Sequence, residues 1–113
     1  MTEICRGRMP LDWLRTHWWP ADRDWDTCRA GFVNVWHYRC LVQSVRRDGL
    51  HTPVILGYNG WVWDGRHRVY AAGDVGLDIV PFVLDGPKHG REPDAWRGPP
   101  GGQLPDIPQE WRT

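Results

Sequence analysis

The dipeptide Asn59–Gly60 stands between two short apolar runs, and this pattern constrains the fold of the 113-residue chain more than any other. The run before it is Pro53–Tyr58, rich in β-branched residues, and the run after it is Trp61–Trp63. An Asn-Gly pair adopts the positive φ angles that a two-residue hairpin turn requires. The sequence therefore predicts two antiparallel strands joined by a tight turn.

A helix is predicted on each side of this hairpin. Before it, apolar residues recur at spacings of three and four between residues 36 and 48, and Gly49 follows as a C-cap; these residues are Tyr38, Leu41, Val42 and Val45. After it, Asp64 is a suitable N-cap for a helix that ends near Gly76, with Val69, Ala72 and Val75 on one face. Both segments are predicted to be amphipathic helices that cover a sheet.

The remaining segments complete an α+β fold with a mixed sheet of about four short strands and two main helices. Met9–Leu14 alternates apolar and polar residues and is predicted to be the first strand, and residues 79–84 are predicted to be the last. Residues 16–34 show no clear period. Residues 86–113 contain 5 Gly and 6 Pro, so we expect a domain over residues 1–85 and an extended or disordered, flexible tail, pinned at most by a tryptophan.

Composition narrows the class of protein. The 14 basic and 14 acidic residues balance, which argues against a protein that binds polyanions indiscriminately. An apolar signal core and a long apolar run are both missing from the sequence, so a cytoplasmic location without a membrane partner is expected. Cys5, Cys28 and Cys40 have no Cys-x-x-Cys spacing and predict neither a disulfide framework nor a zinc site.

The segment that carries chemistry is Asp64–Arg68, where the hairpin gives way to a helix. Backbone N–H groups in the first turn of a helix lack internal partners and attract phosphate. Gly65 would let a ligand approach the backbone, and Arg66, His67 and Arg68 could add charge and hydrogen-bond donors. The alternative is structural: the arginines are exposed or paired with nearby aspartates such as Asp64, and the histidine is bonded within the core.

The order of these motifs resembles the ParB/sulfiredoxin superfamily, in particular the ParB N-terminal domain in its stand-alone phage and plasmid form, often described as a ParB-like nuclease. The likeness covers residues 9–85. It rests on Gly49-Leu50-x-x-Pro53-Val54, the hairpin, the glycine and arginine at the helix start, Ala71-Ala72 and Val80-Pro81.

The resemblance implies a small domain whose glycine/arginine turn holds the phosphates of a nucleotide. Gly65 matches the glycine of that turn and Arg68 its arginine, while His67 matches a histidine found in some branches and Arg66 a variable position. Sulfiredoxins carry their reactive cysteine where this chain has Arg66, so reduction of sulfinic acids is not expected.

A nucleotide hydrolase, phosphotransferase or nuclease of this kind would use a nucleoside triphosphate with Mg²⁺, and carboxylates would hold the metal. Asp64 is the nearest candidate for a catalytic or metal-binding residue, and Asp22, Asp24 and Asp26 form an acidic cluster that the fold could bring alongside. The competing interpretations are a helix cap for Asp64 and a solvated loop for the other three.

The tryptophans suggest a second kind of function. Trp61 and Trp63 alternate in a strand and are predicted to pack together in the core. Trp18 and Trp19 are adjacent and hard to bury together, so one of them could stack on a base or a partner. The alternative to nucleotide binding is thus a non-catalytic interaction module that binds a host protein or DNA through exposed tryptophans and the tail.

Overall fold

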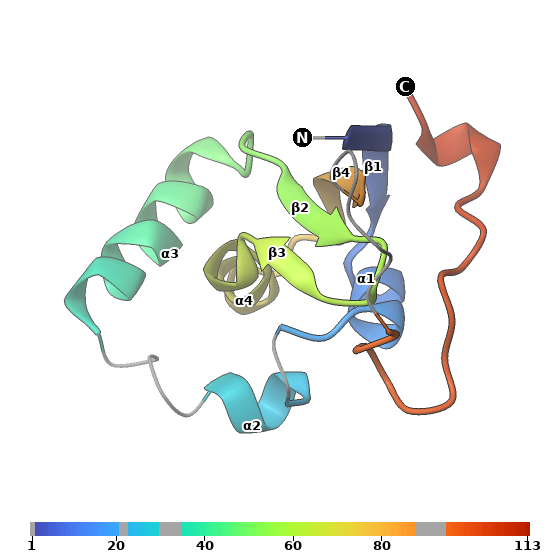
Figure 1. Cartoon of the computed structure of the whole chain (residues 1–113). Helices are drawn as coiled ribbons and strands as arrows, with labels where there is room; N and C mark the ends of the chain where they lie inside the picture. Colours follow the sequence, from blue (N-terminus) through green and yellow to red (C-terminus); the bar gives the residue numbers. More distant parts are fainter. Residues whose placement is uncertain (1, 21–22, 30–34, 88–94) are drawn as a thin grey trace.

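A mixed four-stranded sheet organises the chain in the computed structural model, which describes residues 2–20, 23–29, 35–87 and 95–113 (Figure 1). The strands are β1 (Thr2–Pro10), β2 (Val54–Gly57), β3 (Val62–Asp64) and β4 (Ile79–Gly86). Their spatial order is β1-β4-β2-β3, with β2 parallel to β4 and the other neighbours antiparallel. The connection from β2 to β4 therefore includes the hairpin partner β3 and a helix.

The helices lie beside this sheet. They are α1 (Leu11–His17), α2 (Trp25–Arg29), α3 (Trp36–Asp48), α4 (Arg66–Val75) and a 3-10 turn, η1 (Gln109–Trp111). α4 packs against β2 and α1, and α3 packs against α4 (Figure 1). No helix in the described part of the chain has both the length and the apolar character of a membrane span.

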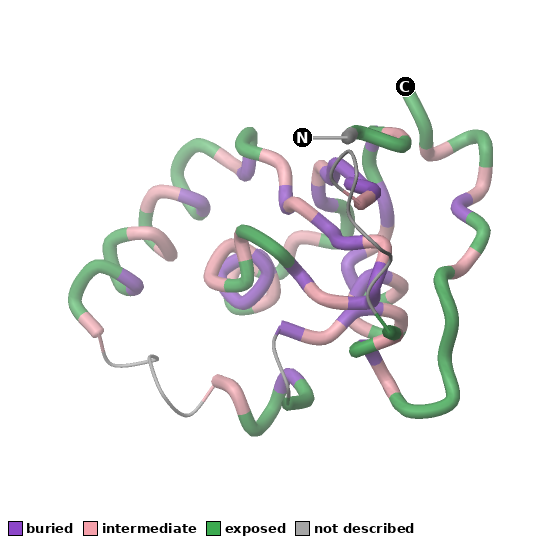
Figure 2. The backbone as a smooth tube through the Cα atoms, viewed as in Figure 1, coloured by how far each residue is buried: buried purple, intermediate pink, exposed green. Residues whose placement is uncertain are grey.

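The core lies between the sheet and α4 (Figure 2). Alternate residues of β2 and β4 point into it, as expected for strands with one face on the core. The residues are Val54 and Leu56 from β2, Val80, Phe82 and Leu84 from β4, and Val69, Ala71 and Ala72 from α4, each at most 3% exposed. Met9, Leu14 and Trp18, all at 0% exposure, extend the core beneath β1 and α1.

The central part of the sequence prediction is confirmed. The hairpin, both main helices and the last strand are present, and the α+β class and the mixed sheet hold. α3 has the predicted bounds, and Gly49, with φ +80°, donates its N–H to the carbonyl of Val45. Gly76, with φ +87°, ends α4 in the left-handed conformation.

The predicted first strand is wrong. β1 ends at Pro10, and Leu11–His17 forms α1 instead. Leu11 and Leu14 are three residues apart, so both can face the core from one helical turn, and both are buried. Proline is tolerated at a helix start, where Pro10 occupies the N-cap position. β1 owes its length to pairing with β4 over residues 2–10, a contact that local alternation does not reveal.

The C-terminal segment from residue 95 packs against the domain. Ile107 is 3% exposed within the core cluster, and the ring of Trp111 meets Trp13 edge to face with centroids 5.0 Å apart. Arg112 forms a β-bridge with Gly7. The described residues 95–113 thus contact the rest of the domain, and the division of the chain into a domain over residues 1–85 and a tail over residues 86–113 stays a prediction.

Candidate functional site

The N-terminus of α4 has no side-chain cap. Gly65 occupies the N-cap position with φ +102°, and no side chain accepts a hydrogen bond there. Asp64 is therefore not the helix cap that its position predicted, because the glycine is the residue that turns the chain from β3 into α4. The first turn of α4 also contains no acidic residue. The first N–H groups of a helix have no partner within the helix and lie at the positive end of its dipole, a setting that favours anions.

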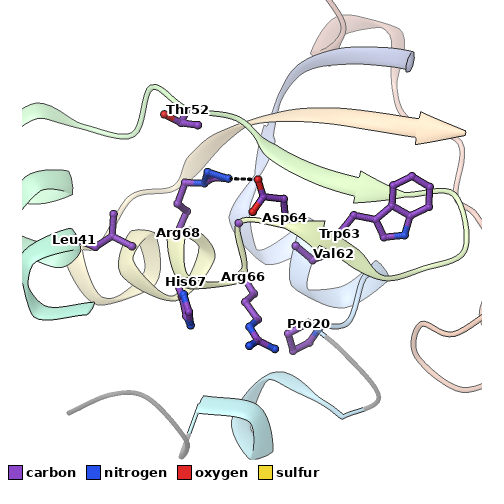
Figure 3. Close-up of a pocket in the computed structure, with 10 residues that line it drawn as sticks. Pro20, Leu41, Thr52, Val62, Trp63, Asp64, Arg66, His67 and Arg68 are labelled. Carbon is purple, nitrogen blue, oxygen red and sulfur yellow. Dashed lines mark ion pairs between the residues drawn. The ribbon is translucent and has the colours of Figure 1, made fainter. Parts of the chain in front are cut away.

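A cavity of about 630 Å³ lies at this helix start (Figure 3). Residues 62–68 form most of its wall, and Leu41 of α3, Thr52 of the loop before β2, and Pro20 complete it. The predicted phosphate residues Gly65, Arg66, His67 and Arg68 thus all line one cavity. Leu41 and Thr52 were not predicted, since they come from segments brought there only by packing.

Arg68 occupies the centre of the site. Its guanidinium lies over Gly65, so that a Cβ at residue 65 would be 3.0 Å from its Nε and Nη2. The side chain is 16% exposed, and its Nε is buried with no hydrogen-bond partner among the described residues. A buried donor without a partner costs about 1–3 kcal/mol. An oxygen that accepted a hydrogen bond from this Nε would remove that cost.

Asp64 pairs with this arginine. Its Oδ2 is 3.3 Å from Nη2 of Arg68, and its side chain is 75% exposed (Figure 3). The pairing is one of the structural alternatives that the sequence offered. An ion pair with so exposed a partner contributes little to stability, because water and salt screen it.

Arg66 and His67 point away from Arg68, on the other side of the start of α4 (Figure 3). The ring centroid of His67 is 6.4 Å from those of His37 and Tyr38. Burial lowers the pKa of His67, and the positive charge of Arg66 and of His37 lowers it further. The three side chains thus leave the helix start in two directions, with Arg68 on one side and Arg66 and His67 on the other (Figure 3).

The two described members of the predicted acidic cluster, Asp24 and Asp26, do not line this cavity. Asp22 lies outside the described residues, while Asp24 directly precedes α2 and Asp26 lies in its first turn. Asp24 accepts the N–H of Thr27 at 2.8 Å, and this hydrogen bond lowers the pKa of its carboxyl. Within the described ranges, no three His, Cys, Asp or Glu side chains gather to hold a metal. Among the described residues that line the cavity, Asp64 is the one carboxylate.

Burial excludes Trp18, but not Trp19, as the stacking residue, and the predicted core position of Trp61 and Trp63 is wrong. Trp18 is fully buried and donates its indole N–H to the carbonyl of Gly57 at 2.9 Å, so it offers no face to a base. Trp19 is half-buried and forms a β-bridge with Trp61. Trp61 and Trp63 do not fill the core either: Val62, 7% exposed, faces it, and Trp63 is 37% exposed on the opposite face. The strand alternates as predicted, but with the opposite face inward.

Comparison with known proteins now decides the fold. The sequence matches no protein-family model and no curated protein. A solved structure described as a Pnob8-like ParB-N domain superposes with a TM-score of 0.55 at 15% sequence identity, over 77% of this chain. The fold is ParB-N-like. At this identity the likeness is one of fold alone, and the chain spans 31% of the length of the ParB-N structure.

The ParB-N-like fold agrees with the resemblance found in the sequence. It does not identify a ligand.

Proposed function

We propose that this ParB-N-like domain binds the phosphates of a nucleotide at the start of α4. The observation that carries the proposal is the position of Arg68, whose guanidinium lies over Gly65 at the uncapped first turn. A phosphate there would receive backbone N–H groups and a charged donor together. Helix N-termini and guanidinium groups are both well suited to phosphate oxygens.

The surroundings support a ligand larger than one phosphate. Arg66 and His67 lie on the other side of the helix start, so a second phosphate or a ribose could approach them while the first contacts Arg68. The cavity, at about 630 Å³, lies in the size range of small-molecule sites. The proposal concerns binding; hydrolase, phosphotransferase or nuclease activity would need a metal, for which Asp64 is the one acidic residue among the described residues of the cavity wall.

Calorimetric titration with ATP, CTP and GTP, each with Mg²⁺, tests the proposal. Arg68→Ala is expected to weaken nucleotide binding about tenfold or more, because a charge-assisted hydrogen bond is lost. Arg46→Ala is the matched control, since Arg46 is an exposed arginine of α3 outside the cavity. Circular dichroism should show both variants folded. Unchanged affinity in folded Arg68→Ala would contradict the proposal, and so would wild-type protein that binds none of the three nucleotides.

The interaction-module hypothesis has one observation in its favour. Trp36, the first residue of α3, is 76% exposed, although neither Trp18 nor Trp111 is free to meet a partner. If this module binds DNA, fluorescence anisotropy of a labelled duplex should show binding that weakens with salt and is reduced in Trp36→Ala. A duplex that stays unbound at low salt would contradict the DNA form of the hypothesis.

A further inference from the structure

The sheet face that points away from the core holds a second cavity, of about 300 Å³. Met9 and Val80 are partners across β1 and β4, and both point into the core. Because side chains alternate along a strand, the neighbouring pair, Arg8 and Pro81, points to the opposite face, where both residues line the cavity. This cavity shares no described lining residue with the one at the start of α4, so a ligand here would be separate from the proposed phosphate site.

The lining of this cavity combines basic side chains with apolar surface. Arg6 and Arg8 come from β1, and His51 comes from the loop before β2. Pro81 of β4, the strand next to β1, and Pro53 supply apolar surface. No acidic residue is among the described residues that line the cavity. A cavity lined by charge of one sign attracts a ligand of the opposite sign, here an anion.

Arg8 and His51 can both donate to such a ligand. No ion pair between described residues includes Arg8, and its side chain is exposed. Nε2 of His51 lies 2.6 Å from the carbonyl oxygen of Asp48. A carbonyl can only accept, so Nε2 carries a hydrogen, and Nδ1 can donate to an anion when the ring is protonated.

Arg6 already holds a carboxylate. Its Nε lies 3.0 and 3.1 Å from the two carboxylate oxygens of Glu3, which does not line the cavity. The side chains of Arg6 and Glu3 are 57% and 36% exposed, so water and salt screen the pair and a ligand can replace it at little cost. Glu3 is therefore a competitor for any anion that binds Arg6.

Arg6 and Arg8 are spaced to match an extended chain. They are two residues apart on one strand, so they point to the same face with Cα atoms about 7 Å apart. Acidic side chains at alternate positions of an extended peptide have the same spacing. The edge of β1 is already paired at Gly7 with Arg112, so a peptide would lie over the sheet face and would not add a strand there.

We propose that this sheet face binds an extended acidic segment of a partner protein, whose carboxylates, two residues apart, pair with Arg6 and Arg8. The stems of these acidic side chains pack on Pro53 and Pro81. Guanidinium and carboxylate groups form bidentate, charge-assisted hydrogen bonds, which supply both affinity and a defined register.

Single-stranded nucleic acid is the other regular polyanion that such a surface could meet. Sites for it stack the bases on aromatic rings. Of the described lining residues, Phe82 is 1% exposed with its side chain in the core, and His51 alone offers an exposed ring. The lining therefore favours the peptide, and an oligothymidylate serves as the competing ligand in the test.

The experiment is an NMR titration of the isotope-labelled full chain with two peptides of equal composition. Ser-Ser-Glu-Ser-Glu-Ser-Ser carries its carboxylates at alternate positions, and Ser-Ser-Glu-Glu-Ser-Ser-Ser carries them side by side. The alternating peptide is expected to shift the amide signals of Arg8 and Val83 and to bind about threefold more tightly than the other, because only its carboxylates match both arginines.

Two variants should change the affinity in opposite directions. Arg8→Ala should weaken binding of the alternating peptide about fivefold, because one charge-assisted pair is lost. Glu3→Gln should strengthen it about twofold, because Arg6 is released from its carboxylate. The matched controls Arg46→Ala and Asp26→Asn make the same changes in charge at exposed residues outside the cavity, and both should behave as wild type.

Equal affinity for the two peptides, or unchanged affinity in folded Arg8→Ala, would overturn the inference. An alternating peptide that shifts no amide signal, or that binds Glu3→Gln less tightly than wild type, would do the same. Tighter binding of the oligothymidylate, lost in Arg8→Ala, would identify a nucleic-acid site instead. Arg68→Ala should leave peptide binding unchanged, so this inference and the proposed phosphate site can fail separately.

Discussion

Gly65 and Gly76 lie at the two ends of α4, and both adopt left-handed backbone with φ of +102° and +87°. They differ in what surrounds them. A Cβ at Gly65 would meet the Arg68 guanidinium at 3.0 Å, while a Cβ at Gly76 would meet nothing within 4 Å. Gly65 is therefore required both for its left-handed backbone and because a Cβ there would press on the Arg68 guanidinium. Gly76 is required for its left-handed backbone only.

This difference gives a paired prediction. Gly65→Ala and Gly76→Ala should each lower the free energy of unfolding by about 1–2 kcal/mol, the cost of left-handed backbone for a residue with a Cβ. Only Gly65→Ala should also weaken phosphate binding, because it displaces the guanidinium of Arg68. Urea denaturation measures the first effect and titration with pyrophosphate and Mg²⁺ the second. Equal affinity in the two variants would show that contact with Gly65 does not position Arg68.

His67 should make stability depend on pH. Burial, together with the charge of Arg66 and His37, lowers its pKa below the value of 6.5 expected in the unfolded chain. As pH falls through 6.5, the unfolded state takes up a proton before the folded state does, so this group favours unfolding; the loss is complete once pH is below both pKa values.

The variant that tests this is His67→Gln, which cannot titrate. Between about pH 7.5 and about pH 5, wild-type protein should lose more stability than the variant in urea denaturation. The two curves should run together above the unfolded pKa apart from a constant offset. A variant that loses as much stability as wild type across this range would exclude His67 as the source.

At the scale of elements, α2, α3 and α4 meet at one carboxylate. The Tyr38 hydroxyl of α3 donates to Oδ2 of Asp74 on α4 at 2.6 Å, and Arg29 of α2 pairs with the same carboxylate. Burial raises the pKa of Asp74, but the hydrogen bonds from Tyr38 and Arg29 outweigh that effect and lower it. The contact helps to hold α3 against α4 and hence Leu41 at the cavity.

Tyr38→Phe should lower the free energy of unfolding by about 1 kcal/mol, the usual net value of such a hydrogen bond. A double-mutant cycle with Asp74→Ala isolates the contact, because Tyr38→Phe should cost much less once the carboxylate is gone. The measurement is urea denaturation of the wild type, both single variants and the double variant. Additive costs would mean that the tyrosine stabilises the fold through other neighbours.

The sequence predicted best the elements whose apolar pattern repeats over many residues or whose turn has a specific sequence. α3 repeats its apolar residues over 13 positions and ends at a glycine, and the hairpin turn is an Asn-Gly pair. In contrast, Leu11–Leu14 is too short to distinguish period two from period three, and pairing with β4 decides that β1 lies before it.

The candidate site also has a part that the sequence predicts and a part that it does not. Gly65, Arg66, His67 and Arg68 are contiguous, so their convergence on one helix start follows from the sequence. The directions of their side chains do not, and neither does the arrival of Thr52 and Leu41 from other segments. Side-chain direction depends on packing against neighbours that only the tertiary structure supplies.

The C-terminal segment contacts two parts of the domain that lie far apart in the sequence, the hairpin turn and β1. Trp96 packs by Gly60 in the hairpin turn, and the N–H of Arg97 donates to the carbonyl of Asn59 at 2.6 Å. Further along, the N–H of Thr113 donates to the carbonyl of Arg6 in β1 at 2.9 Å. The segment therefore spans from the hairpin to the edge strand, and its composition alone, rich in Gly and Pro, does not reveal this.

Ile107 should be the residue that makes this segment part of the domain. It is 3% exposed within the core cluster, whereas Leu104, three residues earlier, is 38% exposed. Ile107→Ala should lower the free energy of unfolding by about 2–4 kcal/mol, through lost burial and the cavity left behind. Leu104→Ala, the matched control in the same segment, should change it by at most about 0.5 kcal/mol.

Urea denaturation measures both variants, and hydrogen exchange shows whether the segment is held. In wild type the amide of Thr113, bonded to β1, should be protected, and in Ile107→Ala it should exchange faster because the segment leaves the edge strand more often. If Ile107→Ala costs no more than Leu104→Ala, the segment is not anchored through Ile107. The domain would then be stabilised by the sheet and α1, α3 and α4 without it.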